Sequence, residues 1–124
     1  MNYTKITASS GAVLGAAENR TLYSSDLASP VTNLHQMSGL HTFIVSIVND
    51  QTLSLILERN AAVIGTWTAV QTVAVGIPAA GNANVVNFLI EPYHNFRIRA
   101  VGGGTIQGVW IVDMAMSDDR ASTS

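Results

Sequence analysis

The chain has 124 residues, no cysteine, and a formal net charge of −2 from six basic and eight acidic side chains. This length is typical of one domain that buries its own core, and the lack of cysteine excludes disulfides, thiolate metal sites and cysteine nucleophiles. Lys5 is the only lysine, so the sequence lacks the basic patch on which nucleic-acid binding depends.

The low density of charge is the most unusual property of the composition. Charged residues make up 11% of the chain, against about 25% in typical soluble domains. A surface this neutral is poorly protected against association. We therefore expect part of the exterior to be covered by other copies of the chain or by another protein; the alternative is a neutral monomer with a surface rich in hydroxyl groups.

Residues 1–39 have the weakest pattern in the chain. Tyr3 and Ile6 are expected in a first strand, and residues 8–38 are expected to form an extended arm or an irregular connection. The first residues lack the basic segment and apolar core of a secretory signal, so we expect synthesis in the cytoplasm. Polar residues interrupt the apolar run at 63–80, and a membrane helix is not expected there.

Residues 40–117 show the period of two that is typical of β-strands. Residues 41–50 alternate with Phe43, Val45 and Ile47 on one face, and residues 53–59 place leucines on one face in the same way. Because Asn49-Asp50-Gln51 lies between these runs, the sequence predicts a hairpin.

Further strands are expected after this pair. Residues 63–75 are rich in β-branched side chains, with a bend expected at Gly65, and residues 76–84 form a loop. Residues 85–91 point Val86, Phe88 and Ile90 to one side. A turn at 91–95 then leads to residues 96–101, whose Phe96, Ile98 and Ala100 are expected inside while Arg97 and Arg99 point outward.

Three glycines, Gly102 to Gly104, precede the last strand. A phosphate-binding loop would have to open a helix, and the following residues keep strand spacing, so the glycines predict a hairpin turn instead. Both faces of the last strand are apolar. One face carries Trp110, and the other carries Val109, Ile111 and Ala115. A strand that is apolar on both faces is expected to be buried on both. We expect one face to pack in the core and the other against another subunit.

Together these elements predict an all-β fold, an antiparallel β-sandwich of jelly-roll type with an extended N-terminal arm. A small closed barrel is the alternative architecture. The expected divisions are residues 1–39 as first strand and arm, 40–117 as sandwich core, and 118–124 as a polar tail.

No catalytic, cofactor or metal site is predicted, so we expect a protein that is not an enzyme. A nucleophile motif is missing, and His35 and His41 lack the spacing of a helical metal pair. His41, His94 and one carboxylate could form a metal site, but the residue pattern gives this no specific support. Two carboxylates out of Glu58, Glu91 and Asp113 could form a glycosidase pair, but the residue pattern gives this no specific support.

The residue pattern offers two candidate binding sites. Arg97 and Arg99 could contact acidic groups of a partner, or pair with Glu58 or Glu91 in the same chain. Tyr93 and His94, in the turn at 91–95, are candidates for a carbohydrate-binding surface, whereas Trp110 is expected in the core.

Residues 91–120, EPYHNFRIRAVGGGTIQGVWIVDMAMSDDR, resemble decoration or cement proteins of tailed-bacteriophage capsids. The resemblance implies a structural virion protein without cofactors, made in the host cytoplasm and bound on the capsid surface to the major capsid protein as a symmetric oligomer, a trimer in many of these proteins. It implies no membrane or nucleic-acid partner. The candidate contact residues are Val109, Ile111, Ala115, Arg97 and Arg99. The alternative function is a carbohydrate-binding module of a fibre or receptor-binding apparatus.

Overall fold

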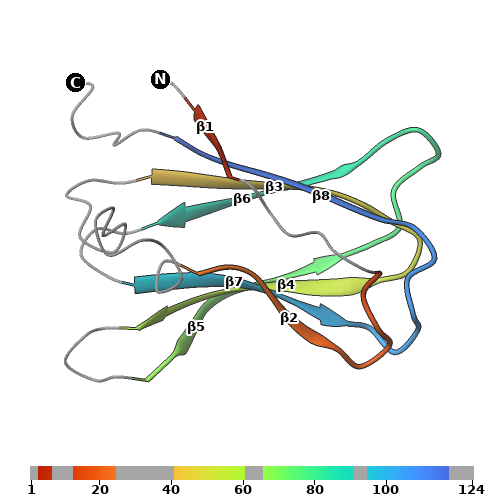
Figure 1. Ribbon diagram of the computed structural model, residues 1–124, viewed down its shortest axis with the longest axis horizontal. Helices are drawn as coiled ribbons and strands as arrows, with labels where there is room; N and C mark the ends of the chain where they lie inside the picture. Colours follow the sequence, from red (N-terminus) through yellow and green to blue (C-terminus); the bar gives the residue numbers. More distant parts are fainter. Residues whose placement is uncertain (1–2, 7–12, 25–40, 61–65, 91–94, 118–124) are drawn as a thin grey trace.

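The computed structural model describes residues 3–6, 13–24, 41–60, 66–90 and 95–117. These residues contain no helix and form two layers of antiparallel strands (Figure 1). The eight strands are β1 (Tyr3–Ile6), β2 (Asn19–Ser24), β3 (His41–Asn49), β4 (Leu53–Asn60), β5 (Thr68–Val75), β6 (Asn84–Ile90), β7 (Asn95–Gly102) and β8 (Trp110–Ser117).

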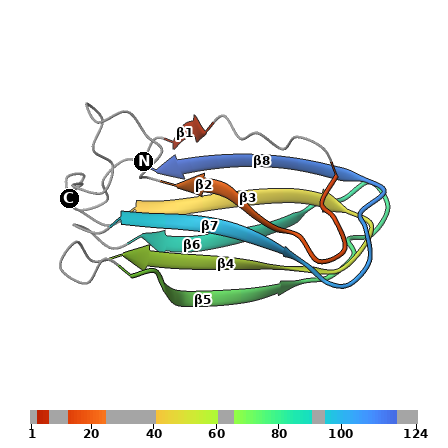
Figure 2. The same cartoon turned by 60° about the horizontal axis from the view of Figure 1, so that its bottom comes forward.

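The strands pair in a nested order. Strand β1 pairs with β8, β2 with β7, β3 with β6 and β4 with β5, every time antiparallel. Because β3 also pairs with β8, and β4 with β7, the strands form one sheet in the order β1-β8-β3-β6 and a second in the order β2-β7-β4-β5 (Figure 2). Eight strands in two sheets with this order form a jelly-roll sandwich, which confirms the predicted fold class and rules out the closed barrel.

The core lies between the two sheets because alternate side chains of each strand point inward. Strand β3 shows strict alternation, with its odd-numbered residues buried. Tyr23, Phe43 and Phe96 join the two layers in one aromatic cluster, with ring centroids 5.3 to 5.7 Å apart. The inward side chains expected for residues 41–47, 53–57, 86–90 and 96–100 are confirmed, although Val86 is only partly buried.

The hairpin predicted for residues 41–59 is wrong. Strand β3 lies in the first sheet and β4 in the second, so residues 50–52 cross from one layer to the other. The reason is that alternation reports which face of a strand is buried, and both strands of such a crossing bury one face just as a hairpin would.

The hairpin predicted at Gly102 to Gly104 is also wrong, because β7 and β8 belong to different sheets. These residues run instead along the segment before β2. The Gly102 amide donates to the Glu18 carbonyl and the Gly104 amide to the Ala16 carbonyl, both at 2.9 Å. At Gly102 a Cβ atom would lie 2.3 Å from the Gly15 carbonyl oxygen, so the close approach of two backbones explains the glycine there.

The arm predicted for residues 8–38 is wrong for the part that the structure describes. Residues 19–24 form β2, which pairs with β7, and Leu14 and Leu22 are buried in the core. Few apolar residues mark this stretch, so its pattern was weak although Leu14 is fully buried. The rest of the predicted arm, the bend at Gly65, the turn at 91–94 and the tail at 118–124 lie outside the described residues.

Two buried amide side chains hold the connections at one end of the sandwich. Gln107, which is 1% exposed, accepts hydrogen bonds from the Asp50 and Gln51 amides and donates to the Gln51 carbonyl. Asn49 donates to the Gln51 and Gly76 carbonyls. Because buried backbone groups need partners, these amides fix three crossing loops to one another.

We expect Gly102→Ala to lower the free energy of unfolding by about 2 kcal/mol, because the added Cβ would overlap the backbone of residues 15 and 16. Gly76→Ala is the matched control, since nothing lies within 4 Å of a Cβ atom at that position. Urea unfolding of both variants measures the difference. Equal stability of the two variants would show that the close approach is unimportant.

Candidate protein-binding surface

The outward face of the first sheet is poor in charge. Strands β3, β6 and β8 turn six apolar side chains to this side, which we call the outer apolar face; they are Ile44, Val48, Val85, Leu89, Ile111 and Ala115. Asp113 is the one ionised side chain that these three strands turn outward on this face. The face therefore has the composition expected of a contact surface.

The strand register brings these side chains together. Val48 pairs with Ile111, and Ile44 pairs with Ala115, so β3 and β8 form two apolar cross-strand pairs. Val85 of β6 lies opposite Ser46 on the other side of β3. Since directly paired residues have Cβ atoms about 5 Å apart, the members form neighbouring contacts on one surface.

Several of these side chains are exposed to a degree that is unusual for their type. Val85 is 63% exposed, Ile111 55% and Leu89 47%. Val109, just before β8, is 46% exposed. Two predicted contact residues, Val109 and Ile111, thus lie at the surface, and Ala115 is half-buried beside Ile44.

Arg97 and Arg99 lie on the outward face of the other sheet, away from these residues. Both contact Glu58: Arg97 Nε is 2.5 Å from Glu58 Oε1, and Arg99 Nε is 2.9 Å from the same atom. Arg99 also donates to Glu58 Oε2 and to the Asn19 side chain. This is the pairing within one chain that the sequence left open; a contact of these arginines with a partner stays a prediction.

The buried carboxylate and its two arginines hold each other in place. Burial alone would raise the pKa of Glu58, but hydrogen bonds from Arg97 and Arg99 outweigh it and hold that pKa below its ordinary value. The Arg97 guanidinium also stacks over the Trp67 ring, 4.4 Å from its centroid. The cluster therefore joins β4 to β7 on the outside of the second sheet.

The described residues do not assemble the catalytic sets considered from the sequence. Glu58 and Asp113 lie on the outward faces of different sheets, and Glu91 is outside the described residues. His41 is buried, and its Nδ1 donates to the Ser117 carbonyl at 2.7 Å. Among the described residues no group of three or more histidine or acidic side chains is placed to hold a metal ion.

The predicted carbohydrate site is not described. Tyr93 and His94 fall outside the described residues, and Trp110 is 7% exposed, as expected of a core residue. Arg97 occupies one face of Trp67, the remaining tryptophan. Within the described ranges no helix is long and apolar enough to cross a bilayer.

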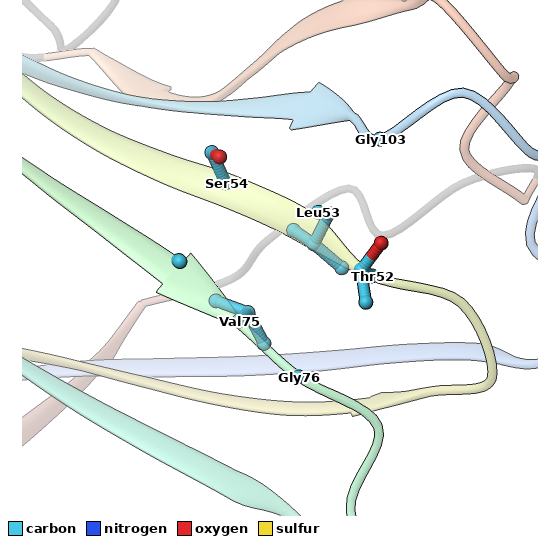
Figure 3. Close-up of a pocket in the computed structure, with 7 residues that line it drawn as sticks. Thr52, Leu53, Ser54, Val75, Gly76 and Gly103 are labelled. Carbon is cyan, nitrogen blue, oxygen red and sulfur yellow. The ribbon is translucent and has the colours of Figure 1, made fainter.

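A shallow hollow of about 260 Å³ lies where β4 begins and β5 ends (Figure 3). Leu53, Val75, Gly76 and Gly103 form much of its wall, and the hydroxyls of Thr52 and Ser54 supply its polar side-chain atoms. No ionisable side chain lines the hollow, so it contains no group suited to acid, base or nucleophilic chemistry.

One surface feature escaped prediction although its signal is present in the sequence. Residues 60–90 contain no Asp, Glu, Lys, Arg or His. This stretch forms β5 and β6, which are the last strands of the two sheets on the same side of the sandwich. Val70, Ile77, Val85 and Leu89 are exposed within it. The distribution of charge along the chain, in addition to its total, would have indicated this side as a contact surface.

No protein-family model matches the chain, and no curated protein matches it. Its fold is similar to the crystal structure of the PBSX exported protein XepA, with a TM-score of 0.64 and 17% sequence identity. The match covers 96% of this chain but 38% of that protein, so the chain spans well under half of the length of XepA. At this identity the likeness supports the sandwich fold alone.

We expect Glu58→Gln to lower the free energy of unfolding at pH 7 by about 2 kcal/mol, because two arginines lose their anionic partner. Since the pKa of Glu58 is lowered in the folded state, its contribution is present above about pH 4.5 and is lost as the pH falls through the folded pKa. Urea unfolding between pH 7 and pH 3 measures both effects.

Glu18→Gln is the matched control for this prediction. Glu18 binds Arg20 at 2.7 Å but is 37% exposed, so solvent screens the pair and we expect a smaller loss. Equal losses for the two variants, or a Glu58→Gln effect that persists unchanged at pH 3, would contradict the role assigned to Glu58.

Proposed function

We propose that this chain is a structural protein of a phage virion that acts by binding other proteins and catalyses no reaction. In this proposal it decorates the capsid surface, contacts the major capsid protein, and forms a symmetric homo-oligomer, a trimer by analogy with the decoration proteins that residues 91–120 resemble. It requires no cofactor, nucleic acid or membrane. The outer apolar face is the observation on which the proposal depends.

The energetics favour a covered face. Exposed valine, leucine and isoleucine side chains each gain about 1.5 to 3 kcal/mol when fully buried, and this gain is the main driving force of association. Side chains on a paired sheet are held in a fixed array, so little conformational entropy is lost when a partner docks. A rigid and nearly uncharged face is thus suited to a permanent protein contact.

The fold is compatible with a virion role. The jelly roll is an architecture that recurs in viral capsid proteins, although the same fold also occurs in lectins and enzymes. Among these uses, the exposed apolar face favours a role in binding other proteins.

We expect Ile111→Asp to weaken self-association at least tenfold, because a carboxylate would be buried at the centre of the contact. Sedimentation velocity over a range of protein concentrations measures the change. The same variant is expected to lose retention on purified capsids in a co-sedimentation assay, while its unfolding transition stays within about 1 kcal/mol of the wild type.

Ile77→Asp is the control, because Ile77 is 60% exposed but lies in the connection between β5 and β6 rather than on the sheet face. A wild-type chain that neither self-associates nor binds capsids at high concentration would overturn the proposal. So would an Ile111→Asp variant that does both as well as the wild type.

A further inference from the structure

The four edge strands of the sandwich differ in how they are protected against pairing with another chain. The edges are β1 and β6 in the first sheet and β2 and β5 in the second. An edge strand presents unpaired backbone N–H and C=O groups, and natural proteins commonly block such edges with charges, prolines or bulges. Strand β1 contains Lys5, and β2 contains Arg20 and a register shift.

Strands β5 and β6 both lack charges and prolines, and β5 is the more accessible of the two because both of its faces are exposed over several residues. Its sequence, TAVQTVAV, contains no charge and no proline, and residues 68–72 are exposed without interruption. A register shift opposite Leu57 and Glu58 leaves Val70 unpaired, so the regular edge runs from Gln71 to Val75. In Figure 2 the strand forms the outermost ribbon of its sheet.

We infer that the β5 edge pairs with the β5 edge of a second copy of this chain, antiparallel across a two-fold axis, so that two four-stranded sheets join into one sheet of eight strands. An isologous contact of this kind needs only one surface that is complementary to itself. The backbone groups of an antiparallel edge satisfy this condition, because each strand offers both donors and acceptors to the other.

The lack of charge favours a second copy over a charged partner. Residues 60–90 carry no ionisable side chain, so this side of the molecule offers nothing to a charged peptide, a nucleic acid or an anionic surface. A like-charged pair directly opposite in a sheet is destabilising, and a copy of β5 brings no charge to the edge. Strand β6, on the same side, is equally free of charge and does not repel the neighbouring molecule.

The proposed pairing of two β5 edges is short, so it is stable only where other contacts already hold the two copies together. Five regular residues extend about 17 Å, and the area buried is below the roughly 800 Å² per partner of stable complexes. The pair is therefore weak in free solution and is stabilised where copies are held side by side. This setting rests on the proposed virion function, in which neighbouring oligomers bound to the capsid meet across local two-fold axes.

Because the chain has no cysteine, single cysteines report the contact without background. We would place one cysteine at each exposed position between residues 69 and 74 and oxidise the purified protein at about 0.5 mM. Directly opposed residues have Cβ atoms about 4.5 to 5.5 Å apart, close enough for a disulfide after a small shift. The expected result is a two-chain product on a denaturing gel that peaks at one or two adjacent positions.

The controls are Thr21→Cys on the edge strand β2 and Thr105→Cys in the loop before β8, both exposed. We expect the peak β5 position to cross-link at least tenfold faster than either control, and Thr72→Lys in the same chain to abolish that difference. Equal rates at all positions, or cross-linking on capsids only to a different protein, would overturn the inference. The purified-protein result is independent of Ile111→Asp binding to capsids, so failure of either proposal is recognised separately.

Discussion

The nested pairing of strands is the constraint on which the rest of the structure depends. Because β1 pairs with β8, β2 with β7, β3 with β6 and β4 with β5, the two sheets can bury their inner faces only against each other. Strands that follow one another then often lie in opposite layers, and the chain must cross between layers with polar backbone inside. Asn49 and Gln107 supply the hydrogen bonds that make these crossings stable.

The same pairing separates two kinds of surface. The second sheet turns Glu58, Arg97 and Arg99 outward, where they satisfy one another. The chain has six basic and eight acidic residues in all. Three of them lie in this one cluster, so fewer charged side chains remain for the rest of the surface. The first sheet is left with an outward face that is mainly apolar, and its position on the opposite side follows from the fold.

The sequence predicted well which face of a strand is buried, and predicted poorly which strands pair with each other. Alternation in residues 41–47 and 96–100 identifies the inward side chains because burial of one face is a local property of a strand. Which strand lies beside it is set by contacts far along the chain, so both predicted hairpins were wrong. For the candidate site, Ile111 was predicted from its own strand. Val85 and Leu89 were missed because Asn87 and Glu91 made the outer side of residues 85–91 look polar.

The two proposed contacts, through the outer apolar face and through the β5 edge, rest on different physics. A face gains free energy in proportion to the apolar area that it covers and has little preference for direction, whereas an edge gains it from backbone hydrogen bonds whose geometry fixes strand orientation. Neither depends on ion pairs, so salt screening leaves both nearly unchanged. Contacts of these two kinds would therefore keep a defined orientation across a wide range of ionic strength, as the proposed virion role requires.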